Sequence, residues 1–101
     1  MKCIKEMVDH IYEELDDAKE YALEAIEIKD INRSLGDTYI ILAKEEMGHM
    51  NRLHDQVTGI ITEYRNQKGE PPEAMLKIYN WEHKKIMECA ATVQVLINNY
   101  K

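Results

Sequence analysis

The sequence has few of the residues that interrupt helices. Among its 101 residues are four glycines, two prolines, one tryptophan and no phenylalanine. Glutamate, lysine, leucine, isoleucine, alanine and methionine are frequent instead, and charged residues make up 32% of the chain. These residue types favour helix, so strands are not expected. We therefore predict an all-α fold, and the chain length predicts one domain that covers residues 1–101.

Long apolar runs and paired cysteines are also missing. No window approaches the roughly 18 apolar residues of a membrane span, so we expect no membrane partner. The two cysteines, Cys3 and Cys89, form no CxxC pair. So few cysteines, without an apolar region at the N-terminus, are typical of a cytoplasmic protein with free thiols. We expect Cys89 to be a small core residue.

Positive charge is scarce in the first part of the chain. Residues 1–30 contain ten acidic side chains and four lysines, whereas the remainder balances nine acids with nine bases, for a net charge of -6. Because no basic stripe is present, neither phosphate groups nor anionic lipids would meet a complementary surface. Nucleic acid is therefore excluded as an expected partner, and a cation is the natural counterpart.

Apolar residues recur at intervals of three and four in three segments, which predicts helices over about residues 3–28, 34–67 and 72–100. Residues suited to helix caps and turns separate these segments: Asp30, Asn32, Ser34, Gly69, Pro71 and Pro72. Short connections favour antiparallel neighbours. We expect an antiparallel three-helix up-down-up bundle that completes a larger bundle by dimerisation.

The second segment carries two ionisable residues where its apolar stripe is expected to continue. The predicted stripe consists of Leu35, Tyr39, Leu42, Glu46, His49, Leu53, Val57, Ile60 and Tyr64. A buried, unpaired carboxylate is costly, so Glu46 should be protonated, paired or bound to a metal. Two interpretations stay open: Glu46 and His49 bind a metal, or they form a metal-free hydrogen-bonded core pair.

A third acidic residue should lie at the same level. Antiparallel packing of the first two helices aligns positions whose numbers sum to about 61. That register places Glu14 beside Met47 and within about one turn of Glu46 and His49. Glu14 is therefore a candidate ligand, and a solvated carboxylate in an acidic helix is the alternative.

Glu14, Tyr21 and the Glu46-Met47-Gly48-His49 motif resemble the ferritin-like superfamily, and "YEELDDAKEYALEA" with "LAKEEMGHMNRL" is similar to rubrerythrins. Members of this superfamily hold two iron or manganese ions with a Glu from each of two helices and a Glu-x-x-His from each of two others. The third helix lacks this motif. The likeness to short encapsulated ferritins implies that two copies of the chain share one site.

The resemblance implies a homodimer, or a higher homo-oligomer, in which Glu14, Glu46 and His49 of two copies provide six ligands. It also implies ferroxidase or peroxide-consuming activity, with Tyr21 as a nearby electron donor; simple packing of the Tyr21 ring is the alternative. We expect no shell-docking peptide after "VLINNYK".

The third helix carries features that the metal hypothesis does not use. Glu82 stands on its apolar stripe with His83 beside it, and its register sets Glu82 near Val57 rather than near Glu46. A second apolar strip contains Trp81, so self-association is expected with or without a metal. The rival hypothesis is therefore a metal-free interaction or scaffold protein that uses Trp81, Glu82 and His83 as a binding face.

Overall fold

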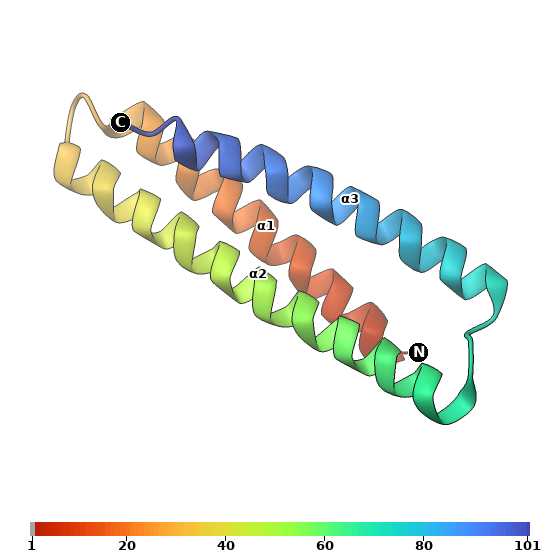
Figure 1. Cartoon of the computed structure of the whole chain (residues 1–101). Helices are drawn as coiled ribbons and strands as arrows, with labels where there is room; N and C mark the ends of the chain where they lie inside the picture. Colours follow the sequence, from red (N-terminus) through yellow and green to blue (C-terminus); the bar gives the residue numbers. More distant parts are fainter. Residues whose placement is uncertain (1) are drawn as a thin grey trace.

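The computed structural model describes residues 2–101, which form three α-helices: α1 (Lys2–Ile28), α2 (Arg33–Lys68) and α3 (Glu73–Asn98). They lie side by side in an elongated helical bundle of 56 × 18 × 18 Å (Figure 1). Residues 2–101 contain no strand, so the prediction of three helices in an all-α fold is confirmed, with helix ends displaced by at most two residues. None of the helices in this range combines the length and apolar character needed to span a membrane.

The ends of α2 follow the turn residues that the sequence contains. Asn32 caps its N-terminus, since the side-chain oxygen accepts a hydrogen bond from the Leu35 backbone N–H at 3.1 Å. Gly69 ends the helix with a φ of 81°, a backbone conformation that residues other than glycine rarely adopt. Its backbone N–H donates to the Arg65 carbonyl at 3.0 Å. These two positions set where the chain leaves α2 and therefore how long the helix is.

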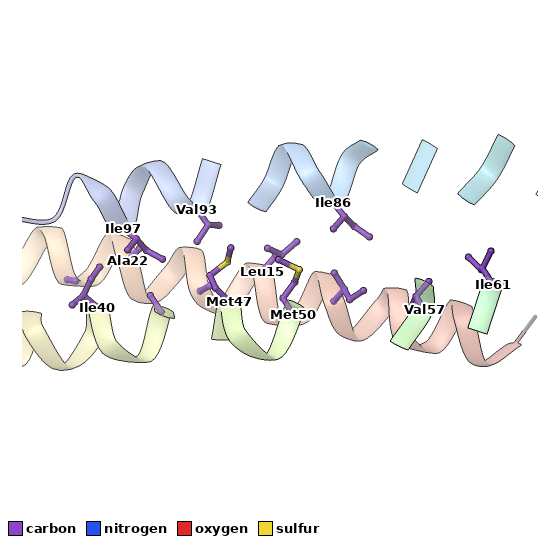
Figure 2. Packing of buried hydrophobic residues seen from close by; sticks show 14 residues of the cluster. Leu15, Ala22, Ile40, Met47, Met50, Val57, Ile61, Ile86, Val93 and Ile97 are labelled. Carbon is purple, nitrogen blue, oxygen red and sulfur yellow. The ribbon is translucent and has the colours of Figure 1, made fainter. Parts of the chain in front are cut away.

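The buried face of α1 is the one that the apolar period predicts. Its buried residues are Ile11, Leu15, Ala18, Ala22 and Ala25. The three alanines have short side chains, so the backbone of α2 can approach closely along this part of α1. Figure 2 shows the buried side chains of all three helices directed into the space between them. Helix α1 thus provides the surface against which α2 packs along its length.

The stripe predicted for α2 is wrong in phase. The residues that are buried are Gly36, Ile40, Ala43, Met47, Met50, Val57 and Ile61. Of the predicted stripe only Val57 is buried, Glu46 is half-buried, and Leu35 and His49 are exposed. Helix α2 has apolar residues on several faces, and the face with glycine and alanine permits the closest approach to the alanines of α1. The helix is therefore rotated by about one residue relative to the expectation, or about 100°.

Helix α3 buries Ile86, Val93 and Ile97 against the α1–α2 pair. Cys89 is exposed, so its predicted core position is wrong; the neighbouring Ala90 is half-buried and packs against the core instead. Figure 1 shows α3 spreading away from the other helices toward its first residues.

Candidate metal centre

Glu14, Glu46 and His49 come together on the surface where α1 meets α2. One ligand atom from each residue lies within 4.8 Å of the others. His49 Nδ1 is 3.5 Å from Glu14 Oε2 and 3.7 Å from Glu46 Oε2. Glu46 and His49 lie three residues apart and therefore on one face of α2, while α1 brings Glu14 to the same level. The structure thus places together the three residues that the sequence singled out as ligands.

The three side chains lie at the boundary between core and solvent. The Glu14 and Glu46 side chains are 26% and 20% exposed, and His49 is 52% exposed. The expectation of an acid and an imidazole in the middle of the core is therefore wrong, because rotation of α2 places Met47 and Met50 there instead.

Glu14 has the least satisfied polar group of the three. Its Oε2 atom is buried and has no hydrogen-bond partner. The same atom lies at ion-pair distance from His49 Nδ1, but this contact lacks hydrogen-bond geometry. A buried carboxylate oxygen without a donor is unfavourable unless a cation or a donor from outside the chain approaches it. The position of this atom is therefore suited to a bound cation.

The ligand types suit a divalent metal ion, but one chain has too few ligand residues for a two-metal centre of the ferritin type. Two carboxylates and one imidazole suit iron or manganese, because carboxylate oxygen and imidazole nitrogen are both ligands that these ions accept. A single chain offers three ligand residues at this place. A two-metal centre of the ferritin type needs twice as many.

Tyr21 lies about two turns along α1 from Glu14. Its half-buried ring stacks on Tyr39 of α2, with ring centroids 6.1 Å apart and an angle of 25° between the planes. A shallow hollow beside this pair is lined by acidic side chains of α1, Glu20, Glu24 and Glu27, among others. The stacked pair joins α1 to α2 on the flank that also carries the three ligand candidates.

Glu82 faces α1. The Tyr12 hydroxyl donates to Glu82 Oε2 at 2.6 Å, and burial together with this hydrogen bond raises the pKa of Tyr12 above its ordinary value. Lys85 lies over the ring of Tyr12 and over that of Trp81, whose side chain is otherwise exposed. Glu82 therefore links α3 to α1 and takes no part in the Glu14, Glu46 and His49 group.

Sequence reasoning missed a histidine pair. His83 of α3 lies beside His54 of α2, with His54 Nε2 at 3.2 Å from His83 Nδ1. Both residues are half-buried. The antiparallel register that predicts Glu82 near Val57 also sets His54 and His83 at similar levels, so the sequence contains a signal for this pair.

Comparison of the chain with protein families, with curated proteins and with solved structures found no match.

Proposed function

We propose that this chain is a ferritin-like di-metal carboxylate protein that binds iron or manganese. The observation that carries the proposal is the convergence of Glu14, Glu46 and His49, together with the unpartnered Oε2 atom of Glu14. The acidic first part of the chain and the ferritin-like spacing of these residues support it.

The proposal includes an antiparallel up-down-up bundle that forms a homodimer through the α1–α2 face. Two copies related by a twofold axis would bring together the three ligands of each copy. Each copy contributes two carboxylates, so the shared centre would carry a charge of about -4 with neutral imidazoles, which two divalent cations balance. Because the three side chains lie at the surface, a second copy can reach them.

Iron bound at such a centre would supply redox chemistry with oxygen or peroxide, which is the basis of a ferroxidase or peroxide-consuming activity. Glu14 and Glu46 would hold and neutralise the cations, and His49 would complete the ligand set from the solvent side. Tyr21 would act at a distance of about two turns as an electron donor, through a ring that its stacking on Tyr39 keeps in one orientation.

The test is metal analysis of protein purified without a histidine tag and exposed to Fe(II) in air. We expect about two metal ions per dimer in the wild type and in the control Glu45→Ala, which removes an exposed neighbouring carboxylate. Glu46→Ala should bind neither iron nor manganese. Equal metal content in the two variants, or a wild type that takes up no iron or manganese, would overturn the proposal; circular dichroism confirms that each variant is helical.

A metal-free interaction protein is the second candidate. An apolar groove of about 410 Å³ between the first halves of α1 and α3 favours it. Its lining includes Ile4, Val8, Met75 and Ile78. A wild-type chain that takes up no metal and has the same melting temperature with and without added iron would support this second function.

A further inference from the structure

Two histidines from different helices form a second cluster of metal-ligating side chains. His54 of α2 and His83 of α3 are half-buried, with ring centroids 5.1 Å apart and planes at 33°. Tyr79, one turn before His83 in α3, stacks on the His83 ring at 6.1 Å between centroids. This stacking limits the orientations of the imidazole. The facing nitrogens are therefore held at a defined separation by three packed aromatic rings.

That separation suits two ligands of one metal ion. Metal–imidazole bonds are about 2.0–2.1 Å long. With such bonds, the 3.2 Å between His54 Nε2 and His83 Nδ1 corresponds to an N–metal–N angle of about 100°. This angle lies between the values for octahedral and tetrahedral coordination. Without a metal, the same distance accommodates an N–H···N hydrogen bond, whose proton can reside on the other nitrogen of its ring when an ion enters.

We propose that His54 and His83 form a second metal site, which binds a borderline divalent ion of the Zn²⁺ class and links α2 to α3. Imidazole nitrogen favours zinc, copper and nickel over manganese, and no carboxylate is among the ligands. Half-burial leaves room for water to fill the remaining coordination positions. The site therefore differs in chemistry from the carboxylate-rich group of Glu14, Glu46 and His49.

An ion bound by this histidine pair would affect how α3 is held against α2. Among the three helix pairs, α2 and α3 have the least extensive packing. An ion bound only in the folded state stabilises that state by an amount that increases with the logarithm of the free ion concentration above the dissociation constant. Zinc at His54 and His83 would therefore clamp α3 to α2 near the middle of both helices.

The first experiment is a Zn²⁺ titration of wild-type protein followed by ¹⁵N NMR of the histidine rings. We expect His54 Nε2 and His83 Nδ1 to shift as ligands, while the ring of His10, which lies on the surface of α1 beside Glu13, stays unchanged. Because this measurement needs no substitution, it does not depend on the folding of a variant. Unchanged signals from His54 and His83 with zinc in excess would overturn the proposal.

The second experiment compares zinc affinity by calorimetry in His54→Gln, His83→Gln and the control His10→Gln. Loss of even a residue that supports a ligand weakens metal binding by 10–100-fold, so loss of a ligand should cost about 100-fold or more. Zinc should raise the melting temperature of the wild type and of His10→Gln by several degrees more than that of the other two variants. Equal affinities in all three variants would contradict the site. In Glu46→Ala the zinc signals of His54 and His83 should persist, which separates this inference from the proposed iron centre.

Discussion

At the scale of single residues, Glu14 combines the ligand role that we propose with a cost to folding. Its buried Oε2 atom has no hydrogen-bond partner, and the Glu46 carboxylate belongs to the same group of ligand atoms within 4.8 Å. Two carboxylates at this separation repel each other, and partial burial strengthens the repulsion. In the absence of metal, the arrangement should therefore be a weak point of the fold.

We predict that Glu14→Gln increases the free energy of unfolding of metal-free protein by about 0.5–1 kcal/mol and abolishes iron and manganese binding. The substitution removes one of the two repelling charges and provides an amide donor. Urea denaturation in the presence of a chelator measures the first effect, and metal analysis the second. The control Glu13→Gln changes an exposed carboxylate and should stay within about 0.5 kcal/mol of the wild type. A destabilised Glu14→Gln that still binds metal would contradict the prediction.

Tyr12, which lies outside the proposed metal group, makes a pH-dependent contribution to the free energy of unfolding. Burial and the hydrogen bond to Glu82 raise the pKa of Tyr12, so the folded chain retains the hydroxyl proton at a pH where the unfolded chain has lost it. The contribution is therefore fully present below the ordinary tyrosine pKa of about 10 and is lost as the pH rises above it.

We predict that Tyr12→Phe lowers the free energy of unfolding by about 1 kcal/mol at neutral pH, because Glu82 loses its donor. From about pH 10 upward the difference from the wild type should shrink. Denaturation series at several pH values give both results. Tyr64→Phe is the control, since the Tyr64 hydroxyl has no hydrogen-bond partner among the described residues. A difference that is constant across the pH range would be inconsistent with the raised pKa.

At the scale of helices, two glycines of α2, Gly36 and Gly59, differ in how closely other parts of the chain approach them. A Cβ atom on Gly36 would lie 2.8 Å from the Tyr100 hydroxyl and 3.1 Å from Lys29 Cα. A Cβ atom on Gly59 would meet nothing within 4 Å. Gly36 therefore allows the start of α2 to pack against the end of α1 and the C-terminal residues, whereas Gly59 is an exposed helical glycine without a packing role.

We predict that Gly59→Ala stabilises the protein by about 0.5–1 kcal/mol, because alanine has the higher helix propensity. Gly36→Ala should gain nothing or destabilise, since the backbone of Lys29 cannot move away as easily as a side chain. The Tyr100 hydroxyl would also lose its position as a donor to Asp37, now at 2.6 Å. Thermal unfolding of the two variants in parallel makes the comparison. Equal stabilisation by both substitutions would show that the start of α2 is not closely packed.

At the scale of the whole molecule, three helices leave apolar side chains uncovered. The exposed ones include Leu23, Ile41, Ile78, Trp81 and Val95. Leu42 lies one turn before Glu46 and is half-buried on the flank that we propose as the dimer face. The proposed metal site and the proposed dimer therefore depend on the same surface.

We predict that wild-type protein sediments as a dimer and that Leu42→Lys is monomeric at the same concentration. Burying a lysine without a partner opposes association. The metal content of Leu42→Lys should fall although Glu14, Glu46 and His49 are all present. Ile78→Lys, on exposed apolar surface of α3, is the matched control and should retain both dimer and metal. A monomeric wild type with full metal content would rule out a centre shared between subunits.

The sequence by itself determined the three helices, their ends and the buried face of α1. These features depend on local propensity, on capping residues such as Asn32 and Gly69, and on a single apolar stripe that has no competitor in α1. The level at which Glu14 meets Glu46 and His49 also followed from the sequence, since it depends only on the length of two helices and the turn between them.

Only the tertiary structure decided which face of α2 is buried. Several of its faces are apolar enough, and the choice depended on how closely Gly36 and Ala43 let the helix approach α1, which is a property of both helices together. That rotation moved Glu46 and His49 from the core to its edge. On α3, the packing of Ala90 against the core left Cys89 exposed. Contacts between α3 and the other helices, such as Tyr12 with Glu82 and His54 with His83, likewise depend on side-chain directions. The sequence of a single helix does not predict these directions, because they depend on how the helices pack together.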